Sequence, residues 1–187
     1  MKPNLFGALG LALIAAAAFA VDQVDLSLIT DKGWVQFTVG GDWKVLKMDT
    51  KNPTKSAVFQ IPNPADEGTA DSTNAAVLLF ALDSAQASAL YAKVRQRYAD
   101  GTKSRLGVWE LFKSEFKERN TSYSGRVAYR DIADAHVCIT FAWPHLRMNP
   151  SDYDIKMEQA FLGMLKSVNG ALGRYPKEKG GVLRRPL

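Results

Sequence analysis

The stretch of sequence that decides the fold runs from residue 121 to residue 144 and reads TSYSGRVAYRDIADAHVCITFAWP. Its first half alternates, with Tyr123, Val127 and Tyr129 on one side and small or charged residues between them. Its second half places an apolar residue at every other position and ends with Phe141 and Trp143. This period of two predicts strands at 121–131 and 135–143. Because the link between them is short, they should pair as antiparallel neighbours.

The same reading extends upstream of this hairpin. A mixed pattern at 108–116 predicts a third strand of the meander, and shorter strand patterns occur at 35–39, 43–48 and 57–61. Residues 75–82 read AAVLLFAL, which is continuously apolar. A strand of that composition is buried on both faces, so we expect it in the interior of its sheet.

Two helices are expected between and after these strands. The first is capped by Asp83, with Gln86 in the reciprocal position, and ends near Gly101. The second starts at Pro150 and stops at Gly170. Its apolar stripe consists of Met157, Phe161, Met164, Leu165 and Val168. These elements predict an α+β fold: a single antiparallel sheet of about six to seven strands packed by two main helices.

The first residues have the features of an export signal. Lys2 precedes an apolar run rich in Ala and Leu, and residues 18–20 read AFA, with small residues at the positions that a signal peptidase reads. A membrane anchor is the alternative, but a spanning helix needs about 20 apolar residues. We therefore expect a signal peptide at 1–20, cleaved near Ala20-Val21, and a periplasmic or secreted protein with no other transmembrane segment.

The remaining chain is expected to form a single domain at 21–169, followed by a disordered basic tail at 170–187. The tail accounts for most of the net charge of +5, so the folded part is expected to be close to neutral and not to bind nucleic acid. The alternatives for this tail are a weak contact with an anionic surface and a segment that only keeps the protein soluble. The single cysteine, Cys138, has no disulfide partner in the chain and is expected to be a buried, inert thiol.

One segment resembles a known family. Residues 34–43 read WVQFTVGGDW, an aromatic strand followed by a Gly-x-Trp turn, and a further strand follows. With the order of elements over residues 24–169, this resembles the PsbP-like α/β/α sandwich, including small envelope domains of the DcrB type. Val39-Gly40 stands where that family usually has a proline before the turn. The resemblance implies a binding or accessory module and assigns no site residue.

The densest polar stretch lies between two strands, at residues 63–74. Asp66, Glu67, Asp71 and Asn74 offer oxygen ligands that could suit Ca²⁺, although their spacing does not match an EF-hand. The alternative is an exposed connection held by side-chain bonds to the backbone. Long loops beside a buried strand often carry binding function, so this loop is the first candidate site.

Other candidates are fewer. His145 follows Trp143-Pro144 and begins the turn into the last helix, so it joins the candidate set. His136 and Cys138 are too local to form a dyad, and no Gly-x-Ser-x-Gly elbow is present in the sequence. The strand aromatics are core residues by default, but some could line a groove between sheet and helix. The basic set Lys93, Arg95, Arg97, Lys103 and Arg105 is either a solvated helix face or an anionic contact surface.

The sequence thus favours an exported, non-enzymatic protein that recognises an envelope partner protein or a small ligand through the sheet and the 63–74 loop. The alternative is a metal-assisted enzyme that uses Asp66, Glu67 and Asp71.

Overall fold

The computed structural model describes residues 23–51, 54–63 and 71–176. Its elements are β1 (Gln23–Ile29), β2 (Gly33–Gly40), β3 (Lys44–Asp49), β4 (Thr54–Ile61), β5 (Thr73–Ala81), α1 (Ala85–Arg97), β6 (Thr102–Leu106), β7 (Trp109–Glu118), β8 (Thr121–Ile132), β9 (Ala135–Pro144), α2 (Tyr153–Ser167) and β10 (Asn169–Leu172). No helix among these residues is both long enough and apolar enough to cross a membrane. The expected signal peptide lies outside the described residues.

Seven strands form an antiparallel sheet in the order β3-β4-β5-β9-β8-β7-β6. The predicted meander is confirmed, because β7 pairs with β8 and β8 with β9. The apolar strand β5 lies between β4 and β9, as expected for a strand covered on both faces. Its alternate residues enter two different cores: Val77 and Leu79 face one, and Phe80 faces the other.

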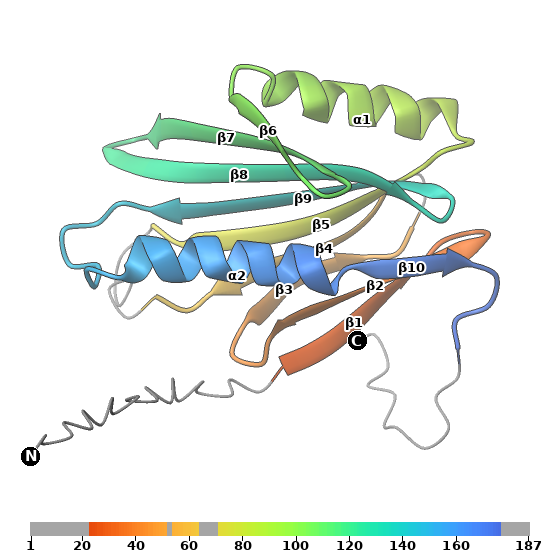
Figure 1. The fold of residues 1–187 in the computed structure, drawn as a ribbon, viewed down its shortest axis with the longest axis horizontal. Helices are drawn as coiled ribbons and strands as arrows, with labels where there is room; N and C mark the ends of the chain where they lie inside the picture. Colours follow the sequence, from red (N-terminus) through yellow and green to blue (C-terminus); the bar gives the residue numbers. More distant parts are fainter. Residues whose placement is uncertain (1–22, 52–53, 64–70, 177–187) are drawn as a thin grey trace, which may run out of the picture.

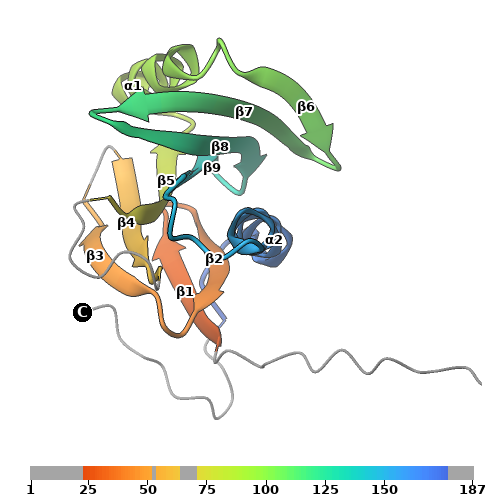
Figure 2. The same cartoon turned by 90° about the vertical axis from the view of Figure 1, so that its left-hand side faces the viewer.

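One face of this sheet is covered by α2 and by a second sheet of three strands, β1-β2-β10 (Figures 1 and 2). The apolar stripe of α2 meets the apolar side of β9 here, with the Phe161 and Phe141 rings 5.9 Å apart. Phe37 of β2 and Phe59 of β4 join the same core. This is the larger core, and its continuity explains why α2 has five buried residues.

The other face carries α1. Tyr91 of α1 packs against Phe80 and Tyr129, and Cys138 is completely buried beneath them. The helix is capped by Ser84, whose hydroxyl accepts from the Ala87 amide. The predicted cap was one residue too early.

The α+β class is confirmed, but the expected single sheet is wrong, since the structure has two. Three strands were not expected: β1 and β10, which both pair with β2, and β6, which pairs with β7. Residue 169 is therefore too early an end for the folded part. The chain continues in β10, and the Tyr175 ring contacts the Trp34 ring edge-on at 5.2 Å. Residues 177–187 of the expected tail lie outside the described residues.

The Gly-x-Trp segment forms the turn that the resemblance implied. The Trp43 amide donates to the Gly40 carbonyl, and the Trp43 ring folds back against Gly40. The ring also contacts Phe59 and Phe141. The turn therefore closes one end of the larger core.

Candidate functional site

The predicted loop reaches the described region at Asp71, just before β5. One carboxylate oxygen accepts from the Tyr123 hydroxyl at 2.7 Å and the other from the Thr121 hydroxyl at 2.8 Å. These two hydrogen bonds, that of Tyr123 first, hold the pKa of Asp71 below its ordinary value. Both oxygens thus join the end of the loop to the start of β8.

In the part of the chain that the structure describes, the other candidate residues of the loop are not found together with Asp71 in one site. Asn74 is in β5, and its amide donates to the Ser72 hydroxyl and carbonyl. Asp66 and Glu67 lie outside the described residues. Within the described ranges, no three His, Cys, Asp or Glu side chains come together in a way that could hold a metal ion. The calcium site therefore stays a prediction that depends on the two undescribed carboxylates.

His145 lies in a different environment, on the α2 side of the sheet. Its Nε2 is 2.9 Å from the Ser124 hydroxyl, and its Nδ1 is 3.6 Å from Asp154. These three residue types, in this order, resemble a hydrolase triad. Sequence reasoning missed this cluster because Ser124 is on a strand and lacks a nucleophile elbow.

The Ser124 hydroxyl is nevertheless committed elsewhere. It donates to the Glu115 carboxylate at 2.7 Å, which can only accept. His145 Nε2 must then donate to Ser124, so it cannot also take the serine proton. The Ser124 residue is 4% exposed, which leaves no approach for a substrate. The cluster fastens the turn before α2 to β7 and β8.

Neighbouring ion pairs also join α2 to the sheet. Arg126 donates to Glu158 of α2 at 2.7 Å, and Lys113 lies 3.1 Å from the same carboxylate. The Arg126 guanidinium also lies 4.8 Å from the centre of the Trp143 ring. These side chains face α2, so their charges are used to hold the helix against the sheet.

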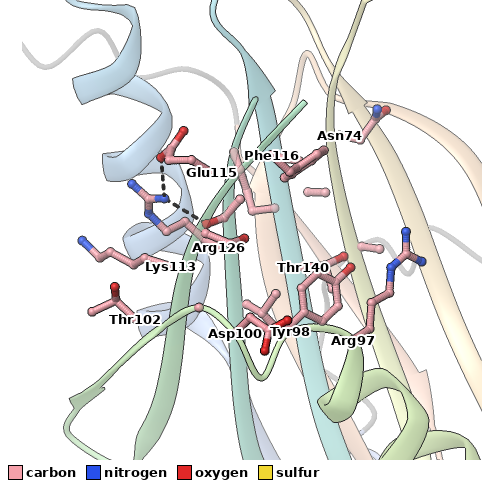
Figure 3. Close-up of a pocket in the computed structure, with 18 of the residues that line it drawn as sticks. Asn74, Arg97, Tyr98, Asp100, Thr102, Lys113, Glu115, Phe116, Arg126 and Thr140 are labelled. Carbon is pink, nitrogen blue, oxygen red and sulfur yellow. Dashed lines mark hydrogen bonds and ion pairs between the residues drawn. The ribbon is translucent and has the colours of Figure 1, made fainter. Parts of the chain in front are cut away.

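A cavity of about 760 Å³ lies on the opposite face, beside the end of α1 (Figure 3). Its floor is set by strand register. One row of residues crosses five strands as Gln60, Asn74, Ala142, Gly125 and Ser114. The next row toward α1 contains Val58, Ala76, Thr140 and Val127. All but Gln60 line the cavity, and none is charged.

Helix length explains why this part of the sheet is open. A helix of 13 residues is about 20 Å long, whereas a 12-residue strand such as β8 spans about 40 Å. The side chains under α1 are large, including Leu78, Tyr129 and Phe112. They become small where the helix ends, so the sheet does not fill the space itself.

The far wall of the cavity is aromatic. Phe116 of β7 is 40% exposed and stacks on the Tyr123 ring, with centroids 5.3 Å apart and an interplanar angle of 7°. Gly125 lies beside it, where a Cβ would come within 2.7 Å of the Ser114 hydroxyl. Asp71, which holds Tyr123, therefore supports this wall, and Asn74 lies on the floor. Two of the predicted site residues thus belong to the surroundings of the cavity.

The near wall is the end of α1. Tyr98 caps the helix, and burial raises the pKa of its hydroxyl. Arg97 and Asp100 also line this side, and Figure 3 shows Arg97 and Tyr98 at the opposite end of the cavity from Phe116. The sequence allowed for a groove between sheet and helix but could not locate it, because the small floor residues are spread over five strands.

Comparison with known proteins gives little further guidance. No protein-family model matches the chain, and no curated protein matches it either. Among solved structures it is similar to LpqN of Mycobacterium tuberculosis, which is involved in cell envelope biogenesis. The identity is 13%, the TM-score is 0.42, and the match covers 80% of this chain and 92% of that chain. This likeness does not single out the PsbP-like or DcrB-type family and gives no residue of this chain a role.

Proposed function

We propose that this is an exported, non-enzymatic binding protein that holds a small ligand in the cavity beside α1. The observation that carries the proposal is a volume of about 760 Å³ over a floor of small, uncharged side chains. Small-molecule sites in proteins typically measure about 300–1,000 Å³ and combine apolar walls with a few polar groups. The cavity fits both descriptions.

The walls favour a ligand with a flat or apolar body. Phe116 and Tyr98 present ring surfaces on two sides, and Ala76, Ala142 and Val127 lie beneath. Thr140 and Asn74 add polar groups on the floor that can orient a ligand by hydrogen bonds. Same-face rows are two residues apart along a strand, so the Gly125 and Val127 rows that form the floor are about 7 Å apart.

Export is the second component of the proposal and rests on residues 1–20. We expect the protein recovered from the periplasm to begin near Val21, which intact-mass measurement would check. A protein that keeps its first 20 residues and sediments with membranes would contradict export as a cleaved protein.

Binding is tested with phenylnaphthylamine, an uncharged dye whose fluorescence rises in apolar surroundings. The native protein should bind it saturably. Ala142→Trp and Ala76→Trp each place an indole on the floor and should weaken binding at least about tenfold, equivalent to about 1.4 kcal/mol. Lys166→Trp, on the exposed side of α2, is the matched control and should bind like the native protein.

Thermal unfolding of each variant separates a filled cavity from a damaged fold. The proposal fails if the native protein does not bind the dye, or if both folded cavity variants bind it as the native protein does. The two alanines belong to different strands, so a local folding defect at one position leaves the other informative.

A further inference from the structure

Among the basic side chains that line the cavity, Arg97 differs from Lys113 and Arg126 because no described carboxylate pairs with it. It is the last residue of α1 and is exposed. Across the described ranges no carboxylate lies within ion-pair distance of the Arg97 guanidinium. The guanidinium carbon lies 5.9 Å from the centre of the Tyr98 ring. An arginine presents five donors, so most of its hydrogen-bonding capacity is directed to solvent.

Nearby basic residues are already used. Arg95 and Lys103 both pair with Glu110, and none of the three lines the cavity. Lys113 and Arg126 contribute to the lining but pair with Glu158 on the α2 face. A ligand in the cavity would therefore meet one basic side chain, Arg97, that no carboxylate in the described part of the chain neutralises.

Two negative charges near Arg97 could repel an anionic ligand: the C-terminal end of α1 and the Asp100 carboxylate. The C-terminal end of a helix carries roughly half an elementary negative charge, which the full charge of Arg97 exceeds. Asp100 also lines the cavity, but no ion pair joins it to Arg97. In Figure 3 the Asp100 carboxylate lies on the far side of Tyr98 from the guanidinium.

From this arrangement we infer that the ligand is amphipathic, with an apolar body over the small rows and an acidic group that accepts from Arg97. The acidic group can be a carboxylate, a sulfonate or a phosphate, since each offers the oxygens that a guanidinium binds. This inference rests on the proposed function and adds the ligand's charge. It also makes Arg97 a residue that serves binding more than folding, because no carboxylate of residues 23–51, 54–63 and 71–176 pairs with it.

The test uses two dyes that differ by one acidic group. Anilinonaphthalene sulfonate has the ring system of phenylnaphthylamine with a sulfonate added. Arg97→Gln should weaken binding of the sulfonate dye roughly three- to tenfold and change binding of the neutral dye by less than about twofold. Lys93→Gln removes another exposed charge of the same helix and should leave both dyes unaffected.

Salt gives a second measurement. Raising ionic strength should weaken binding of the sulfonate dye to the native protein, and this dependence should shrink in Arg97→Gln. If Arg97→Gln changes both dyes equally or neither, the inference is overturned. Binding of the neutral dye by the native protein, and its loss in Ala142→Trp, would show that the cavity itself still binds. If the native protein binds neither dye, the proposed function fails as well.

Discussion

Gly170 provides a sharp test of the fold, because it lies where the expected tail proved to be a strand. A Cβ at this position would lie 2.4 Å from the Trp34 carbonyl oxygen and 2.6 Å from Ile132 Cγ2. The first of these atoms is backbone of β2 and cannot yield without moving the strand. Gly170→Ala should therefore cost about 1–3 kcal/mol, as overpacking of a close contact does. For a domain of this size that lowers Tm by about 2–12 °C.

Gly163 is the matched control. It lies on the exposed side of α2, and a Cβ there would meet no atom within 4 Å. Alanine is the better helix former, so Gly163→Ala should stabilise the protein by about 0.5–1 kcal/mol. Thermal unfolding followed by far-UV circular dichroism measures both. If Gly170→Ala were as stable as the native protein, β10 would not pair with β2 as described, and the folded part would end where the sequence alone suggested.

Three further predictions concern the sites described above. Asp71 has a lowered pKa, so the stability that its ionised carboxylate adds to the fold is present above its ordinary pKa of 3.8 and is lost as the pH falls through the lower pKa of the folded state. Urea unfolding should therefore show Asp71→Asn to be less stable than the native protein at pH 7, and the difference in free energy of unfolding should shrink toward pH 3. An equal difference at both pH values would argue against the Tyr123 and Thr121 hydrogen bonds. Burial raises the pKa of the Cys138 thiol to about 12, so Ellman's reagent should react only after unfolding in guanidinium chloride, and rapid reaction with the native protein would contradict the burial beneath α1. Phe161 is 1% exposed, and Phe161→Ala should cost about 3–5 kcal/mol in urea unfolding, whereas a loss below about 1 kcal/mol would mean that α2 does not cover the larger core.

Local patterns predicted the elements that carry a strong periodic signal. The 121–144 hairpin, the apolar strand at 75–82 and the Phe161 stripe of the last helix are all found near their expected positions. Each depends on neighbours in sequence: alternation along one strand, or a stripe along one helix. These signals fixed the α+β class and the meander.

Elements held by distant partners could not be predicted. β10 contains Gly170 and has no apolar period, and it is a strand because β2, far upstream in the chain, offers it an edge. β6 pairs with β7, the next strand in the chain, but it is exposed along its whole length, so its sequence shows no buried side. A distant partner and full exposure both leave no local pattern to detect.

The cavity was hidden for a related reason. Ala76, Gly125 and Ala142 look unremarkable within their own strands and become a floor once register places them beside one another. Asn74 was selected for its oxygen atoms and does line this floor, whereas His145 was selected for its place at the turn into the last helix and holds that turn. Residue type alone did not distinguish the two.

The central claim is that the cavity beside α1 binds a ligand, and amide chemical shifts test it most directly. Isotope-labelled protein titrated with phenylnaphthylamine should show its largest saturable shifts at Ala76, Gly125 and Ala142. Shifts confined to α2 and the three-stranded sheet, or no saturable shift at all, would contradict the account.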